Sequence, residues 1–378
     1  MTTTRVDVAV VGAGIVGLAH ALAAARKGYS VAVFERGPSA SGASVRNFGT
    51  IWPIGQPPGE MHELALLSRQ LWIELLDDAK LPYQPTGSLH VMYRDDEADV
   101  AREFADRAPS LGYDCQWITA NEALGRTNAA SSRGLCGALW SPVELCVDPR
   151  VIASALPRYL TERYGVQFYF SHAVTSIELP VVHAGRTHVE ASAAIVCSGD
   201  DLETLYPEYL LDTGITRCKL QMLRTVAQPN GWQLGPSLAG GLTLQHYASF
   251  KICDSLEALK TRIAEESPEI NRWGIHILVS QTAAGEITLG DSHEYGSAVD
   301  VFDKVEIDRL ILEWASRFLE LPDWSIAQQW HGVYAKHPEK SYLSFSPAER
   351  VHVITALGGA GMTLSMALGE ATVRELAL

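Results

Sequence analysis

Three glycines and a glutamate near the start of the chain have the types and spacing of a dinucleotide-binding motif. Gly12, Gly14 and Gly17 follow an apolar run, residues 6–11, and Glu35 ends a second apolar run, "SVAVFE". The first glycine permits a tight turn, the second lets a pyrophosphate approach the backbone, and the third lets a helix pack closely on a strand. The glutamate would accept hydrogen bonds from ribose hydroxyls and repel a 2′-phosphate, so NADP is disfavoured and NAD and FAD remain.

A strand, a helix and a second strand must position these residues. Residues 6–11 predict a buried parallel strand, and residues 15–25, rich in alanine and leucine, predict a helix that ends near Gly28. The helix N-terminus would offer free N–H groups and a positive dipole end to the phosphates. A glycine-rich turn without a ligand is the alternative, but it leaves Glu35 unexplained.

A second strand, glycine turn and helix are predicted near residue 360. Residues 351–356 predict the strand, Gly358, Gly359 and Gly361 form the turn, and a helix is expected from about Met362. A second helix N-terminus aimed at the cofactor suits a flavin, because its dipole stabilises negative charge on the reduced ring. The alternative is a packing turn at the end of a sheet.

The remaining apolar spacing predicts further helices and a second sheet. Helices are expected over residues 61–79 and 149–164, and an amphipathic helix over 303–320. The stretches "TRCKLQMLRTV", "GGLTLQHYASFKI", "INRWGIHILVSQTAAGEITLGDS" and "SIAQQWHGVYAKHP" alternate apolar and polar residues, as strands of a half-covered antiparallel sheet do. On the second stretch His246 and Tyr247 would face opposite sides, and "GALWSPVELCVDP" predicts a hairpin.

Length and charge exclude several classes of partner. The 378 residues suffice for two domains or for one large domain with an insertion. A net charge of -14 argues against nucleic acid or an anionic membrane as the main partner. The six cysteines form no CxxC pair and no histidines have zinc-ligand spacing, so we expect reduced thiols, no metal and a cytoplasmic location. We also expect no transmembrane segment and no signal peptide.

Taken together, the first motif, the "CSG" turn of Ser198 and Gly199, and "GGAGMT" resemble the FAD-dependent amine oxidases. That family includes D-amino-acid oxidase, glycine oxidase and sarcosine oxidase, and the resemblance spans the whole chain in order. It implies an α/β fold of the glutathione-reductase-2-like type, in which an antiparallel-sheet substrate domain is inserted into a Rossmann-type FAD-binding domain. The expected FAD-binding segments are residues 1–84, 148–215 and 334–378, and the expected substrate-domain segments are 85–147 and 216–333.

The resemblance also implies the cofactor contacts. In the family, the segment after the acidic strand wraps the FAD pyrophosphate and then runs beneath the flavin ring, and "SGASVRNFGTIWP" fits that place, beginning at Ser41. Arg46 would contact either the pyrophosphate or the substrate. Sarcosine oxidases attach FAD to a cysteine, but "WHGVYAKHP" has none, so non-covalent FAD is expected. The expected cofactor-binding residues are Gly12, Gly14, Ile15, Val16, Gly17, Glu35, Arg36, Ser44, Arg46, Asn47, Phe48, Gly49, Val174, Ser198, Gly199, Gly358, Gly359, Gly361, Met362 and Thr363.

The sequence departs from the family at the substrate clamp. In the glycine oxidase branch, a strand like "WHGVYAKHP" ends in an arginine that grips the substrate carboxylate. Here Tyr334 stands at that position, and Lys336 follows on the same face of the strand. A tyrosine hydroxyl and an ammonium could hold the three oxygens of a phosphonate. Alternatively, Tyr334 is a core aromatic residue and Lys336 a solvated lysine at the strand end.

Four further residues complete the expected substrate-binding set: Tyr247, Gln221, His331 and Trp52. Tyr247 is chosen because a tyrosine near this place lines the pocket in the resembled family, and Gln221 because it could reach the flavin or the amine. His246 is expected to be structural. No side chain is expected to act as acid or base, because N5 of the flavin accepts the hydride.

A narrower resemblance concerns the substrate. "RNFGTIWPIGQP", "CKLQMLR", "WHGVYAKHP" and "GGAGMTLS" resemble a bacterial flavoenzyme subgroup linked to phosphonate catabolism. It implies an oxidoreductase acting on CH–NH2 or CH–NHR donors, which converts 2-aminoethylphosphonate or its N-methyl derivative to the aldehyde and releases the amine. The alternatives are a glycine, D-amino-acid or sarcosine-type oxidase or dehydrogenase, and a non-catalytic flavin-binding protein. The chain lacks a second motif for NAD(P)H, so electrons would pass to oxygen or another acceptor.

Overall fold

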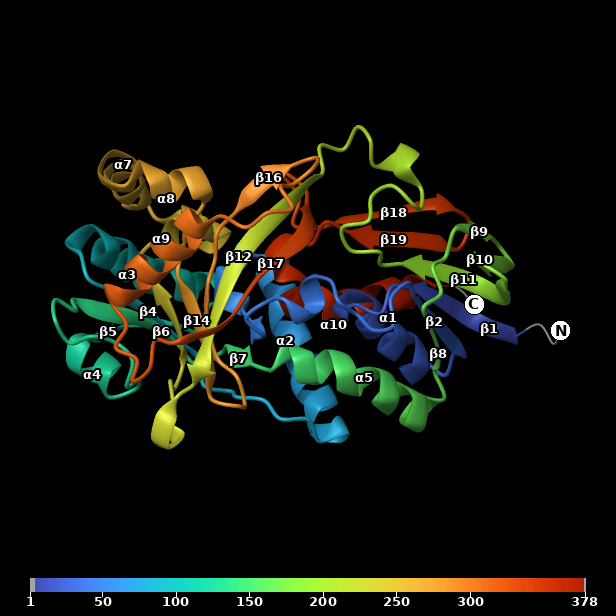
Figure 1. Cartoon of the computed structure of the whole chain (residues 1–378), viewed down its shortest axis with the longest axis horizontal. Helices are drawn as coiled ribbons and strands as arrows, with labels where there is room; N and C mark the ends of the chain where they lie inside the picture. Colours follow the sequence, from blue (N-terminus) through green and yellow to red (C-terminus); the bar gives the residue numbers. More distant parts are fainter. Residues whose placement is uncertain (1–3, 377–378) are drawn as a thin grey trace.

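Two large β-sheets lie toward opposite ends of the molecule (Figure 1). The computed structural model describes residues 4–376. The first sheet has the order β18-β19-β11-β1-β2-β8, and β10 and β9 extend it beside β11. Its strands are β1 (Thr4–Val11), β2 (Val31–Glu35), β8 (Gln167–Phe170), β9 (Ser176–Glu178), β10 (Val181–Ala184), β11 (Thr187–Val196), β18 (Leu343–Ala348) and β19 (Val351–Thr355).

The centre of the first sheet is parallel, as its apolar strands predict. β19, β11, β1, β2 and β8 pair in parallel, and β18 joins the edge antiparallel to β19. Helices cover one face of this sheet and form a shared core with it. At the contact of two of them, a Cβ at Gly369 would lie 2.8 Å from the backbone oxygen of Ala19, so only glycine permits this approach. The helices are α1 (Ile15–Arg26), α2 (Glu60–Ala79), α5 (Pro149–Tyr164) and α10 (Gly361–Glu375).

The second sheet is mixed rather than wholly antiparallel. Its order is β16-β12-β15-β14-β13-β4-β6-β5, with β17 also paired to β12, and β13 runs parallel to β4. Its strands are β4 (Ser88–Met92), β5 (Gln116–Thr119), β6 (Gly137–Ser141), β12 (Thr216–Ala227), β13 (Ser237–Gly240), β14 (Leu278–Gln281), β15 (Glu286–Gly290), β16 (Glu294–Gly296) and β17 (Ile326–Lys336). Its helices are α3 (Asp95–Arg107), α4 (Ala120–Leu124), α6 (Thr243–His246), α7 (Leu256–Glu266), α8 (Pro268–Trp273) and α9 (Val305–Ser316).

Two segments differ from the sequence-based expectations. The residues expected to form a hairpin separate instead, because β6 pairs with β4 and β5 while β7 (Leu145–Cys146) pairs with β3 (Thr50–Ile51). The strand expected around Tyr247 is the short helix α6, followed by a 3-10 helix, Ala248–Ile252. The Thr243 hydroxyl donates to the Gly240 carbonyl over 2.5 Å and turns the chain out of β13.

The long strands β12 and β17 pair with each other near the middle of the molecule (Figure 1). β17 runs through the boundary expected between residues 333 and 334, so the clamp residues Tyr334 and Lys336 still belong to the second sheet. A bridge between Lys336 and Leu357 then brings this strand beside the glycine turn that precedes α10. Among the described residues, no helix is long and apolar enough to cross a membrane.

Candidate active site

One cavity of about 780 Å³ is lined from both sheets. The first sheet contributes the ends of its parallel strands, where Glu35 and Thr355 lie. The second sheet contributes Leu220 and Met222 from β12 and the end of β17. Ligands of parallel α/β sheets bind outside the carboxyl ends of the strands, which is where this cavity lies.

The first glycine turn forms one wall of the cavity, and two of its glycines have no room for a larger residue. Gly12 has φ +101°, and a Cβ there would lie 2.3 Å from the carbonyl oxygen of Cys197. A Cβ at Gly17 would lie 1.9 Å from the carbonyl oxygen of Gly12, so this glycine supports the turn without lining the cavity. The Ser44 hydroxyl accepts a hydrogen bond from the N–H of Ile15 over 2.8 Å and fixes the start of α1.

The carboxylate of Glu35 is fixed at the edge of this turn. Its Oε2 accepts a hydrogen bond from the N–H of Ala13 over 3.0 Å, and its Oε1 accepts one from Gly37 over 2.9 Å. Each carboxylate oxygen retains a second lone pair that can accept a hydroxyl of a ligand. Arg36 also lines the cavity, but its guanidinium is exposed and pairs with Asp201 at 3.1 Å.

The loop after β2 is held in shape by Asn47. Its Nδ2 donates to the carbonyl of Ala43 over 2.9 Å, and its Oδ1 accepts from the N–H of Gly49 over 2.7 Å. Gly49 does not line the cavity: a Cβ there would lie 1.9 Å from the Val147 carbonyl oxygen, so it permits a close backbone crossing. Arg46 lines the cavity and donates through Nη1 to the His331 carbonyl over 3.0 Å.

The second glycine turn faces the same cavity. Gly358 and Gly359 belong to a 3-10 helix, Gly358–Ala360, which leads directly into α10. The N-terminus of α10 therefore opens into the cavity together with Met362 and Thr363. The Thr363 hydroxyl also accepts a hydrogen bond from the N–H of Trp52 over 2.9 Å, which joins this turn to the loop after β2.

These features fit a dinucleotide. Two helix N-termini, two glycine turns and an acidic residue at the end of β2 line one continuous cavity. Side chains at Gly12 or Gly17 would collide with backbone, so glycine keeps the turn compact and lets a pyrophosphate approach its backbone. Other expected cofactor residues line this cavity as well: Gly14, Ile15, Val16, Ser41, Phe48, Val174, Ser198, Gly199 and Gly361.

The second-sheet end of the cavity carries aromatic and polar side chains. Trp52 lies against Tyr247, with 6.2 Å between the ring centroids. Burial raises the pKa of Tyr247 and that of Tyr334, so both hydroxyls stay protonated and can donate. Lys336 lines the cavity, and its ammonium donates to the Tyr295 hydroxyl over 3.2 Å.

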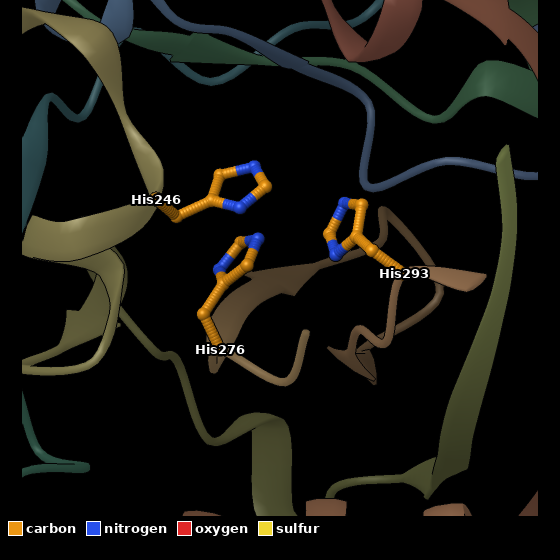
Figure 2. Close-up of side chains that lie close together, drawn as sticks. All are labelled: His246, His276 and His293. Carbon is orange, nitrogen blue, oxygen red and sulfur yellow. The ribbon is translucent and has the colours of Figure 1, made fainter. Parts of the chain in front are cut away.

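Three histidines that the sequence analysis did not assign to the site converge at this end (Figure 2). We call them the histidine cluster: His246, His276 and His293. All three line the cavity with Asp291. His246 was expected to be structural. It lines the cavity, and its ring faces the rings of the other two histidines. In the sequence, only the spacing of Asp291 and His293 could indicate this group, because the two residues share one side of an extended segment. That spacing does not reveal that His246 and His276 lie nearby.

A comparison with known families decides the class of this protein. The model of the family described as "DAO: FAD dependent oxidoreductase" matches residues 7–375. The chain belongs to this family. It is therefore an FAD-dependent oxidoreductase, and the cavity described above has the glycine turns and acidic residue that such a cofactor requires.

Individual members of the DAO family resemble the chain to different extents. The glycine oxidase of Geobacillus kaustophilus (strain HTA426) is 29% identical over 162 residues, which are 41% of this chain and 43% of that protein. The sequence match thus spans less than half of that relative. A glycine oxidase structure from Geobacillus kaustophilus has a TM-score of 0.78 at 21% identity, covering 99% of this chain and 95% of the other. L-proline dehydrogenase from P. horikoshii has a TM-score of 0.80 at 20% identity, covering 99% and 94%. These two likenesses show the fold.

Two of the expected substrate residues lie outside this cavity. Gln221 is on the opposite face of β12 from Leu220 and Met222, because successive side chains of a strand alternate. Its Oε1 accepts from the N–H of Lys304 over 2.7 Å, and its Nε2 donates to Asp308 on α9 over 2.8 Å, so it holds α9 in place.

His331 lies in a separate outer cleft. That cleft has a volume of about 710 Å³ and is also lined by Arg46 and Trp330. Nδ1 of His331 lies 2.9 Å from Oδ1 of Asp303. This contact holds the imidazole of His331 on the outer side of β17, away from the cavity. The contact of His331 with Arg46 goes through its backbone carbonyl, so the imidazole itself does not reach the cavity.

Proposed function

We propose that this DAO-family chain oxidises a small anionic amine, most favourably 2-aminoethylphosphonate or its N-methyl derivative. The observation that carries the proposal is the pair Tyr334 and Lys336 at the cavity end of β17. An arginine fork matches a planar carboxylate in bidentate fashion, whereas a lysine acts as a point charge and tolerates a tetrahedral dianion. Loss of the hydride would leave an imine, and water would hydrolyse this imine to the aldehyde and the released amine.

In this proposal the two ends of the cavity have different tasks. The Gly12 turn, Glu35 and the N-terminus of α10 hold FAD, which when bound accepts a hydride from the carbon beside the substrate nitrogen. Tyr334 donates its hydroxyl hydrogen to the substrate anion, and the ammonium of Lys336 supplies the positive charge. Trp52 and Tyr247 form an apolar wall that orients the carbon chain and limits water. The substrate nitrogen must be neutral, because an ammonium has no lone pair to stabilise the oxidised carbon.

Oxidation of glycine or another amino acid is the second candidate. The sequence match to a glycine oxidase favours it. The replacement of the clamp arginine by Tyr334 disfavours it, because a tyrosine hydroxyl offers one donor where an arginine offers a charged fork. A non-catalytic flavin-binding role is the third candidate, and the buried polar groups at the second-sheet end of the cavity disfavour it.

A substrate panel under anaerobic conditions tests the proposal. FAD-loaded protein is mixed with 2-aminoethylphosphonate, its N-methyl derivative, glycine, sarcosine, D-alanine and propylamine, and loss of the yellow flavin colour is followed in time. We expect the two aminophosphonates to reduce the flavin fastest. A preference for glycine or D-alanine would replace the proposal by the second candidate. Flavin that no amine reduces would support the third.

A further inference from the structure

The histidine cluster has the geometry of a set of ligands around one point. One ring nitrogen from each histidine lies within 4.8 Å of the others. The ring centroid of His246 lies 3.9 Å from that of His276 and 4.4 Å from that of His293. Figure 2 shows the rings directed toward one another from three different segments of the chain. His276 and His293 are buried, so water has little access to them.

The polar atoms of this group are not satisfied by one another. Nδ1 of His276 and Oδ1 of Asp291 are buried without a hydrogen-bond partner. Nε2 of His276 lies 3.0 Å from that Oδ1. A nitrogen and an oxygen that bind one ion lie at about this separation, because both lone pairs are directed at the ion.

The hydrogen bond of His293 leaves its other nitrogen available. Nδ1 of His293 lies 2.9 Å from the carbonyl of Gly274, an acceptor, so this nitrogen carries the ring proton. Nε2 then presents a lone pair, 3.8 Å from Oδ2 of Asp291. Metal-binding histidines are oriented in this way, with the second ring N–H donated to a backbone carbonyl. A phosphonate would need a donor at Nε2, which this tautomer does not offer.

The donor types of the group also suit a metal ion. Three imidazoles and one carboxylate meet at the same end of the cavity. Imidazole and carboxylate groups are donors that bind zinc and similar ions.

We propose that the histidine cluster and Asp291 bind a divalent transition-metal ion of the zinc class at the second-sheet end of the cavity. Ligand atoms about 2.1 Å from a tetrahedral ion lie roughly 3.4 Å apart, so the present separations of up to 4.8 Å must contract on binding. His246 can make most of that movement, because it ends the four-residue helix α6 and is less buried than the other two. The sequence spacing predicted no metal, since the ligands come from distant segments.

The ion would also complete substrate recognition, and this step rests on the proposed function. A phosphonate dianion placed beside Lys336 meets the negative charge of Asp291 at the same end of the cavity. One ammonium does not balance these charges, whereas a divalent cation added to it does. The bound ion would receive a phosphonate oxygen as a further ligand and would act as an anchor, without any change in its oxidation state.

Metal binding is tested on the FAD-loaded protein. The protein is stripped with EDTA and titrated with zinc chloride in a calorimeter, and the ion content after gel filtration is measured by mass spectrometry. We expect one zinc ion per chain. Removing a residue that only hydrogen-bonds to a metal ligand weakens metal binding by about 10- to 100-fold. Loss of a ligand itself, in His276→Ala or His293→Ala, should weaken zinc binding by at least that factor. Absence of a bound ion, or equal affinity in the variants, overturns the proposal.

Two controls keep the result specific. Nδ1 of His183 and Nδ1 of His188 lie 3.0 Å apart in an exposed pair on the first sheet, where an adventitious ion could also bind. His183→Ala with His188→Ala should therefore leave the zinc titration unchanged. Equal FAD content in all variants shows that they are folded. If the cluster variants do not fold, zinc-edge X-ray absorption of the zinc-loaded wild-type protein decides: imidazole nitrogens bound directly to zinc support the site, and oxygen ligands alone overturn it.

The substrate arm separates this proposal from the proposed function. Stripped and zinc-loaded proteins are compared with 2-aminoethylphosphonate and with propylamine. We expect zinc to lower KM for the phosphonate alone. If zinc binds but no aminophosphonate reduces the flavin, the metal site stands and the proposed function fails. If the phosphonate is oxidised and no ion binds, the proposed function stands and the metal site is overturned.

Discussion

The carboxylate of Glu35 accepts a hydrogen bond from the backbone N–H of Ala13 over 3.0 Å. This contact joins the end of β2 to the first glycine turn, which lies after the neighbouring strand β1. The acidic residue therefore has two tasks in the proposed FAD site: it positions the turn, and it keeps lone pairs for the ribose of the cofactor. Substitutions at Glu35 can separate the two.

Glu35→Ala should weaken FAD binding. The change removes charge-assisted hydrogen bonds worth about 1.5–3 kcal/mol, which corresponds to roughly a 10- to 200-fold higher Kd for FAD. Glu35→Gln should lose less, because its amide oxygen can still accept from Ala13, although its NH2 group cannot accept from Gly37. Flavin fluorescence during titration of the apoprotein measures both. An unchanged Kd in Glu35→Ala would place the ribose elsewhere.

Acid precipitation should release the flavin. Cys197 is the cysteine that lines the cavity among residues 4–376, and burial raises the pKa of its thiol. Burial also raises the pKa of Cys218, on β12 beside β17, to about 12. Thiolates, not thiols, are the reactive form, so neither group is activated for attachment to a flavin. We expect a yellow supernatant after trichloroacetic acid, and a pellet that stays yellow contradicts non-covalent binding.

Lys336→Met should impair the phosphonate substrate selectively. The change keeps much of the side-chain length and removes the charge, so a lost charged hydrogen bond of about 1.5–3 kcal/mol predicts a fall in kcat/KM of roughly 10- to 200-fold for 2-aminoethylphosphonate. Propylamine should lose far less, because it offers no anion. Steady-state kinetics with both amines provide the measurement. Equal losses would mean that Lys336 serves the flavin or the fold, for instance through Tyr295.

His90→Leu should make the protein more resistant to acid. His90 is buried on β4 with both ring nitrogens unpartnered, and burial lowers its pKa to about 3. An unfolded histidine has a pKa of about 6.5, so between these values the unfolded chain binds a proton that the folded one does not. Its contribution to stability is complete above pH 6.5 and falls by about 1.4 kcal/mol per pH unit as the pH drops toward 3.

Urea unfolding at pH 7.5, 6 and 5 measures this effect. Below pH 6.5, the free energy of unfolding should fall with decreasing pH less steeply in His90→Leu than in the wild type. The two slopes should differ by about 1.4 kcal/mol per pH unit. The matched control is Leu89→Val on the same strand, which changes a buried side chain without a titratable group and should leave the slope unchanged. A variant with the wild-type slope would show that His90 is not held neutral in the folded protein.

Local patterns in the sequence predicted the elements that carry their own signals. The helix expected over residues 149–164 is α5, because Asp148 caps it, Pro149 begins it and Gly165 ends it in a left-handed conformation. The glycine turns were equally local, since backbone contacts at Gly12 and Gly17 exclude any larger residue. Alternation failed around Tyr247, because a four-residue helix is too short to show its period.

The substrate end could be predicted only in part. One face of β12 meets α9 and the other meets the cavity, and Gln221 lies on the face toward α9. Alternation within one strand predicts two faces but does not tell which of them meets the cavity. The histidine cluster depends on three segments that are distant in the chain and meet only after the second sheet has formed. The sequence pointed to Tyr334 and Lys336 because both stand at a known place in the pattern of the resembled family.

The close packing of α1 against α10 joins two halves of the FAD cavity that are synthesised at different times. The walls of the FAD cavity need the turn at Gly12 and the turn at Gly358, and Gly369 must seat against Ala19 to bring them together. A nascent chain that has displayed β1, α1 and β2 therefore has half of a cofactor site and no means of enclosing the ligand. Enclosure of FAD therefore requires α10 as well as α1, so it follows the synthesis of α10.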